Sequence, residues 1–266
     1  MNWWGRLLGL LIGLAFARVP GALLGFLAGW WFDKALRRDF QGGGFGRYWH
    51  RLDEVGRQQL FFHTTFAVMG HLAKAKGQVV EAEIQAATAL MDRLKLSGKA
   101  REAAKAAFRE GKLAGFPLDA AVLSLREQLG RQRDLQRLFI EIQLQVALAD
   151  GQLHPAEWDV LERIAKGLGL GSKLLKVLIR EAQAGRHFKR EPRESRVAKL
   201  NDAYQILGLE TGAEWTAVRR AYRKAMAEHH PDKLVAKGLP PEMQVLAKER
   251  AQAIQAAYQL IKQSQR

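Results

Sequence analysis

The sequence contains no cysteine among its 266 residues. Disulfide bonds, thiolate zinc sites and cysteine nucleophiles are therefore excluded. Apolar and charged residues are plentiful, at 48% and 26% of the chain. This composition is ample for globular cores, and the length suits one large domain or two small ones with additional segments.

Strand patterns and catalytic patterns are also missing. No stretch alternates apolar and polar residues convincingly, whereas apolar residues recur every three or four positions. No Ser/His/Asp set, carboxylate pair or phosphate-binding loop can be assembled, and the scattered histidines form no ligand set for a metal. We expect an all-α protein that is not an enzyme and that needs no metal or cofactor.

The net charge of +15 raises the question of nucleic-acid binding. The basic residues are spread over predicted helices and junctions, and they form neither a concentrated arm nor a nucleic-acid motif. A membrane surface and an acidic protein partner explain the charge as well. We therefore expect no nucleic-acid partner.

Residues 7–32 form an apolar run of the length that spans a bilayer, interrupted only at Arg18 and Pro20. The run ends in Trp30-Trp31-Phe32 without a small-residue cleavage site, which favours a membrane anchor over a cleaved signal peptide. A re-entrant hairpin broken near Pro20 is an alternative, but one transmembrane helix is the prediction.

The flanking charges predict the orientation of this span. Arg6 and the terminal amine precede it, and five basic residues follow it, namely Lys34, Arg37, Arg38, Arg47 and Arg51. Because basic residues stay on the cytoplasmic side, the long C-terminal portion should be cytoplasmic, with residues 1–6 on the periplasmic side. Residues 33–54 are expected to form a basic, glycine-rich juxtamembrane segment.

A stripe of small residues runs along the span at a spacing of four. It consists of Gly5, Gly9, Gly13, Ala17, Gly21, Gly25 and Gly29. Small residues let two helix backbones approach closely in lipid, so the stripe predicts a homodimer of the span. The charge of Arg18 costs at least ~2.5–3.5 kcal/mol in mid-membrane, which a helix pair accommodates more easily. The alternative is that glycine is simply common in membrane helices.

The region 55–184 is predicted to be a helical domain. Helices are expected near 55–75, 81–95, 99–110, 117–129, 131–149, 154–168 and 171–184. An internal repeat aligns Ala75-Lys76-Gly77-Gln78 with Ala149-Asp150-Gly151-Gln152, and Glu83 with Glu157. Each unit has a helix, a glycine turn and a second helix with Glu in its first turn. Lys76 stands where the second unit has Asp150, so a paired-acid metal site is not expected.

Residues 185–199 are rich in arginine and lysine and almost devoid of apolar residues, which predicts a solvated basic linker. If disordered, it would give the segment 200–266 a reach of roughly 20 Å.

In the segment 200–266, Val218, Ala221, Tyr222 and Ala225 form one apolar stripe of a helix ending near His229. The opposite face is basic, with Arg219, Arg220, Arg223 and Lys224. Pro231 cannot continue the helix, so His230 and Asp232 are predicted to lie on an exposed corner, followed by a loop over 233–239. A short helix stopped by Gly208 and a long helix over 242–261 complete the segment.

His230-Pro231-Asp232, placed between two helices after Tyr204, Ile206-Leu207-Gly208 and Ala221-Tyr222-Arg223-Lys224, resembles the J-domain of DnaJ-family co-chaperones. The loop from Lys233 to Met243 looks like that of a membrane-anchored member. The region 55–184 resembles the TerB-type helical domain that such members carry, a type linked to acidic metal sites. The zinc-binding region and the Gly/Phe-rich linker of the classical DnaJ proteins are absent.

The resemblance implies a partner, the ATP-driven chaperone DnaK, recruited to the cytoplasmic face of the inner membrane. His230, Pro231 and Asp232 would stimulate its ATP hydrolysis, and the four cations of the basic face would steer the encounter. An unknown client or envelope-stress signalling protein is implied as a further partner. Two alternatives are a membrane scaffold that binds without stimulating and a metal-stress protein centred on the TerB-like domain.

Overall fold

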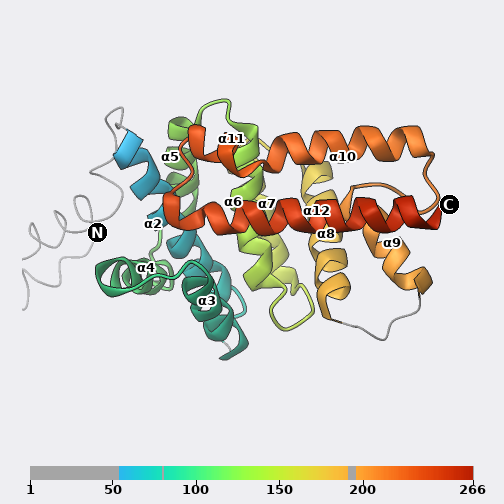
Figure 1. Ribbon diagram of the computed structural model, residues 1–266. Helices are drawn as coiled ribbons and strands as arrows, with labels where there is room; N and C mark the ends of the chain where they lie inside the picture. Colours follow the sequence, from blue (N-terminus) through green and yellow to red (C-terminus); the bar gives the residue numbers. More distant parts are fainter. Residues whose placement is uncertain (1–53, 80, 191–195, 266) are drawn as a thin grey trace, which may run out of the picture. The chain divides into compact units, whose positions relative to one another are not determined.

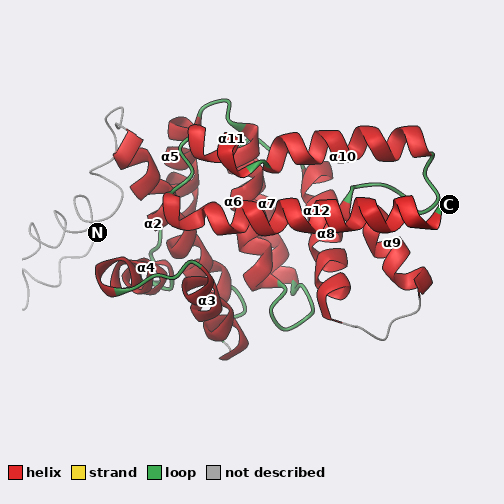
Figure 2. Ribbon diagram, viewed as in Figure 1, coloured by secondary structure: helices red, strands yellow, loops and turns green. Residues whose placement is uncertain are grey.

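The computed structural model describes residues 54–79, 81–190 and 196–265. These residues form helices and turns, without any strand (Figure 1, Figure 2), which confirms the all-α prediction. None of the helices in these ranges is long and apolar enough to cross a membrane. The predicted span 7–32, its small-residue stripe and the juxtamembrane segment up to Asp53 lie outside the described residues.

The helices of the central part agree closely with the prediction. They are α2 (Glu54–Lys74), α3 (Glu81–Arg93), α4 (Gly98–Gly111), α5 (Leu118–Leu129), α6 (Arg133–Ala147), α7 (Pro155–Gly167) and α8 (Ser172–Arg190). The glycines of the repeat, Gly77 and Gly151, have φ of 90° and 101° in the turns after α2 and α6. Because L side chains disfavour this region, glycine suits both helix ends.

Helix α2 lies at the centre of this part. Its apolar residues occupy more than one face, so it is buried between α4, α5 and α6. The ring of Phe61 meets that of Phe139 edge to face, with centroids 5.8 Å apart. A Cβ atom at Gly111 would lie 1.7 Å from the carbonyl oxygen of Ala67, so α2 and α4 cross in backbone contact that only glycine permits.

The C-terminal part is a helical hairpin with a smaller helix across it. It comprises α9 (Arg196–Ile206), α10 (Trp215–His229), the short α11 (Pro231–Ala236), a 3-10 turn η2 (Pro241–Met243) and α12 (Gln244–Ser264). The antiparallel pair α10 and α12 runs across Figure 1, as predicted. The predicted loop over 233–239 is wrong for its first residues: Pro231 starts α11, because proline is well suited to the first position of a helix.

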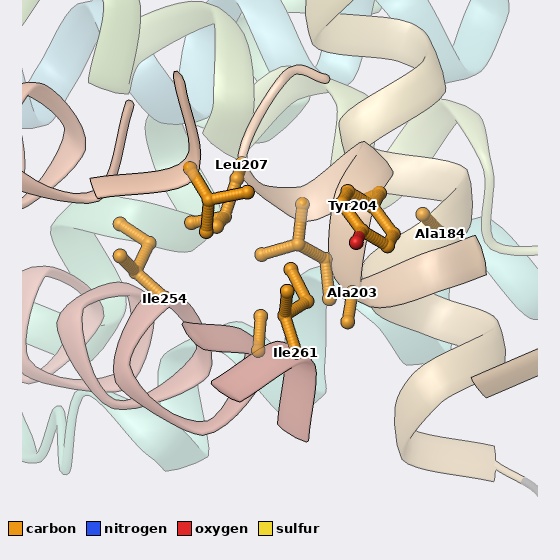
Figure 3. Close-up of a cluster of buried hydrophobic side chains, with 9 residues drawn as sticks. Ala184, Ala203, Tyr204, Leu207, Ile254 and Ile261 are labelled. Carbon is orange, nitrogen blue, oxygen red and sulfur yellow. The ribbon is translucent and has the colours of Figure 1, made fainter. Parts of the chain in front are cut away.

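The core of this hairpin includes residues from outside it. Tyr204, Leu207, Ile254 and Ile261 gather between α9 and α12 (Figure 3), and Ala184 of α8 joins them. Phe188 of α8 packs against the same cluster. Helix α8 therefore belongs to both parts of the chain, and residues from Asp53 to Arg266 form one compact unit.

The basic linker predicted over 185–199 is helical wherever the structure describes it, so the disordered form considered for it does not apply to those residues. Helix α8 continues to Arg190 and α9 begins at Arg196, while residues 191–195 lie outside the described ranges. Arginine and lysine are good helix formers, and the single apolar contact made by Phe188 adds to their intrinsic preference. The boundaries of the three predicted domains remain predictions.

Candidate functional site

The His-Pro-Asp corner lies at the junction of α10 and α11. His229 is the last residue of α10, His230 is extended with φ −65° and ψ 123°, and Pro231 opens α11. The side chains of His230 and Asp232 are 49% and 91% exposed, and His230 Nδ1 lies 4.0 Å from Asp232 Oδ2. The exposed polar corner predicted from the sequence is confirmed.

Buried apolar residues pack next to the corner and fix its backbone. Leu234, Leu239 and Met243 are fully buried under α11 and η2, and the Leu239 amide donates to the Leu234 carbonyl at 2.9 Å. Asp232 and Lys233, at the start of α11, remain exposed above these buried residues. A rigid backbone with exposed polar groups is suited to specific recognition by another protein.

Helix α10 presents its basic residues to solvent. Arg219, Arg220, Arg223 and Lys224 are all exposed, as predicted. Lys224 Nζ approaches Glu228 at 3.9 Å, one turn before the corner. The four cations share the outer face of α10, so they form a positive surface that leads to His230.

Aromatic side chains brace the inner face of the same helix. The ring of Tyr222 stacks on Tyr258 of α12 with centroids 4.1 Å apart, and Trp215 stacks on Tyr258 at 5.3 Å. Val218 is fully buried, and Ala221 and Ala225 pack against the core cluster. The apolar stripe predicted for α10 is therefore confirmed, and it fixes the direction of the basic face.

Sequence reasoning missed His229. Its side chain is only 1% exposed, and burial lowers its pKa to about 4, so the imidazole is uncharged at neutral pH. The Nε2 atom lies 3.6 Å from Glu141 Oε1 of α6, which is too long for a hydrogen bond. The signal in the sequence was Glu141, an acid flanked by Ile140 and Ile142 in the helix predicted over 131–149.

The internal repeat places a second charged cluster inside the central part. Lys76 Nζ lies 2.9 Å from Glu83 Oε1, 2.9 Å from Asp150 Oδ2 and 3.4 Å from Glu157 Oε1. Desolvation opposes the charge of Lys76, but hydrogen bonds to Glu83 and Asp150 raise its pKa above the ordinary value. Equivalent positions of the two repeat units thus face each other across one partly buried ammonium group.

This arrangement differs from that of an acidic metal site. The ammonium group of Lys76 lies within 3.4 Å of all three carboxyl groups and occupies the space between them. No group of three or more metal-binding side chains suited to an ion occurs in the part of the chain that the structure describes. Glu157 also accepts from the amide of His154 at 2.9 Å, which completes the predicted cap of α7.

Three family models match the chain in consecutive segments. The co-chaperone DjlA transmembrane domain matches residues 1–39, the tellurite resistance protein TerB matches 63–177, and the DnaJ domain matches 202–266. The first of these covers the predicted membrane span, and the other two cover the central part and the His-Pro-Asp hairpin.

Similar proteins match the chain along almost its whole length. Co-chaperone protein DjlA of Yersinia pestis is 49% identical over 98% of both chains. Its namesake from Photobacterium profundum is 45% identical over 97% of this chain and 98% of its own. The DjlA protein of Salmonella paratyphi A is 44% identical over 99% of this chain and 98% of its own. No solved structure matches the chain.

These matches extend over the whole chain, and the His-Pro-Asp corner lies where the DnaJ model places its domain. The transmembrane, TerB-like and J-domain segments predicted from the sequence are confirmed by the family models. The chain belongs to the DjlA family of membrane-associated J-domain co-chaperones.

Proposed function

We propose that this co-chaperone recruits a DnaK-type Hsp70 chaperone to the cytoplasmic face of the inner membrane and stimulates its ATP hydrolysis. The observation that carries the proposal is the exposed corner formed by His230 and Asp232 at the end of the basic face of α10. His230, Pro231 and Asp232 would make the stimulating contact. Arg219, Arg220, Arg223 and Lys224 would attract an acidic surface of the partner.

The basic face and the corner have different physical roles in this proposal. Exposed charges act at a distance and raise the rate of encounter, and salt screens them over a Debye length of about 8–10 Å. The corner acts only on contact, since its side chains are short and its backbone is held by buried Leu234. The J-domain itself performs no covalent chemistry.

Steady-state ATPase assays test the proposal. The full chain, reconstituted in nanodiscs, should stimulate ATP hydrolysis by DnaK, and His230→Gln should reduce stimulation to the background rate while circular dichroism stays unchanged. His187→Gln is the matched control, because His187 is an exposed histidine of α8. A folded His230→Gln variant that stimulates normally would overturn the assignment. A wild-type chain that binds DnaK without stimulation would favour the scaffold alternative.

The membrane topology rests on the charges that flank the predicted span. Five basic residues follow residue 32, against Arg6 and the terminal amine before the span. This asymmetry places residues 33–266 in the cytoplasm, where DnaK-type chaperones hydrolyse ATP. A recruited chaperone would then work on clients or signalling proteins at the membrane, including proteins of the envelope-stress response.

Homodimerisation of the span rests on the stripe from Gly5 to Gly29. Replacing Gly13, Gly21 and Gly25 by leucine keeps the span apolar, so insertion should persist while close approach of two backbones is lost. Leu10, Leu14 and Phe26, changed to other large apolar residues, provide the control. A dimerisation reporter should lose signal only with the glycine set. Equal signal from both sets would mean that the stripe is incidental.

A further inference from the structure

A cluster of charged side chains joins the J-domain to the central domain beside the His-Pro-Asp corner. Arg137 of α6 binds three carboxylates, at 2.9 Å to Glu141, 2.7 Å to Glu181 of α8 and 3.0 Å to Glu228 of α10. Glu228 stands two residues before His230. The side chain of Arg137 is 15% exposed and that of Glu181 is 5% exposed, so these ion pairs are largely shielded from water.

The J-domain contributes cations to the same contact. Arg250 of α12 reaches Glu181 with one nitrogen and lies 3.7 Å from Glu141 Oε2 with another. Lys237, just after α11, pairs with Asp134 in the first turn of α6, and Glu249 of α12 pairs with Arg93 of α3. The central domain thus offers Asp134, Glu141 and Glu181 as an acidic docking surface for this side of the J-domain.

Residues on both sides of the His-Pro-Asp motif in the sequence take part in this contact. Glu228 and His229 precede the motif, Lys237 follows it, and all three face α6. Neither ring nitrogen of His229 has a hydrogen-bond partner in the described part of the chain. A buried imidazole left unpaired costs free energy, so the docked arrangement has to be stabilised by the ion pairs around it.

Docking leaves the predicted partner surface open. His230, Asp232 and the four cations of α10 remain exposed, while the residues that face α6 and α8 are the ones that become buried. Two sets of charges are therefore separated on one small domain. One set is used internally, and the other is available to an acidic partner.

We propose that the central TerB-like domain is a platform that docks the J-domain through Asp134, Arg137, Glu141 and Glu181 and presents its His-Pro-Asp corner in a fixed orientation. These four are positioning residues, because they act on the partner only through the corner. The inference rests on the proposed function in naming DnaK as the partner. Preorganisation of the corner lowers the ordering cost of the complex, so docking strengthens the interaction with DnaK.

Crosslinking measures the docking of the J-domain on the central domain in the absence of DnaK. The chain has no native cysteine, so Arg93→Cys with Glu249→Cys provides one thiol on each side of the contact. The exposed ion pair lost at these positions contributes little to stability. A short bismaleimide should couple the two thiols rapidly in the full chain in nanodiscs. Adding Asp134→Lys should slow coupling at least about tenfold, because the partly buried Lys237 would lose its partner and meet a like charge.

A charge exchange shows whether slower coupling comes from loss of the Asp134–Lys237 ion pair or from a general loss of structure. Asp134→Lys together with Lys237→Asp restores opposite charges across the contact and should restore the coupling rate. Asp119→Lys is the matched control, since Asp119 pairs with Arg163 on the exposed surface of the central domain. Its coupling rate should equal that of the parent. A coupling rate unaffected by Asp134→Lys would overturn the docking.

ATPase stimulation then tests whether docking helps the His-Pro-Asp corner to act on DnaK. Asp134→Lys should raise the concentration of chain needed for half-maximal stimulation of DnaK about three- to tenfold, with the maximal rate unchanged, and the charge exchange should reverse this. The crosslinked chain should stimulate as well as the parent. Loss of stimulation on crosslinking would overturn the inference and mean that the docked face blocks DnaK. A parent without any stimulation would overturn the proposed function, while the coupling rates would still report docking.

Discussion

In the central domain the ammonium group of Lys76 lies among Glu83, Asp150 and Glu157, and its side chain is only 14% exposed. In the J-domain the side chain of Lys224 is 74% exposed and approaches one carboxylate at 3.9 Å. The same chemical group is thus bound by three partners in one region and directed into water in the other.

The difference shows how burial decides what a charge can do. A buried cation must be matched by anions, because desolvation without compensation is very costly, and its energy is then committed to the fold. An exposed cation contributes little to stability, typically 0 to about 1 kcal/mol per ion pair, but its field reaches an approaching molecule. Removing charges from the two regions should therefore have different consequences.

The largest expected effect on stability comes from Lys76. Lys76→Met should destabilise the fragment 53–266 by about 3 kcal/mol, because three carboxylates would be left without a cation, two of them buried. Urea denaturation measures this change. Lys105→Met, which breaks an exposed pair with Glu102, should change stability by less than about 0.5 kcal/mol. Equal effects of the two substitutions would remove the contrast between buried and exposed cations.

His229 should make the stability of the fragment depend on pH. Burial lowers its pKa from 6.5 to about 4, so the unfolded chain binds the proton more readily than the folded chain. Stability is therefore complete above pH 6.5 and is lost as the pH falls toward 4, by up to about 3 kcal/mol. His71, whose pKa burial also lowers, acts in the same direction. His229→Gln should remove most of the pH dependence between 4.5 and 6.5, and His71→Gln less. A fragment with unchanged slope after His229→Gln would contradict the burial of this imidazole.

The smallest effect in free energy is expected at the basic face, where only the rate of encounter should change. Arg223→Glu with Lys224→Glu should slow association with DnaK up to about tenfold at low salt and flatten its salt dependence. Urea denaturation should detect little change. Stopped-flow association rates at two salt concentrations measure the effect. An unchanged association rate would mean that these residues only solvate the surface of α10.

Much of the fold could be predicted from the sequence because its signals are local. Helical periodicity, the glycines at 77 and 151, and Pro231 each act within a few residues of themselves. The repeat aligned Lys76 with Asp150, but the contact between their side chains was not predicted. The exposed corner was predictable as well, since proline ends α10 whatever packs around it.

The remaining features depend on residues that are distant along the chain. Nothing near His229 in the sequence indicates burial, which comes from α6 and α12. The pairing of Arg137 with Glu228 spans 91 residues, and no periodic pattern links them. Helix α8 was predicted to end near 184 because its last turns are almost purely polar. In the structure, Phe188 packs against the J-domain core, which explains why the helix continues.

The shared helix α8 has a consequence for synthesis on the ribosome. Ala184 and Phe188 are translated before any residue of α9, yet they belong to the core that α9, α10 and α12 complete. The nascent J-domain therefore condenses on a surface that has already emerged and folded, since domains generally fold in N-terminal order during translation. The His-Pro-Asp corner is translated before α12, so it reaches its final packing only when α12 has emerged and packed against α11.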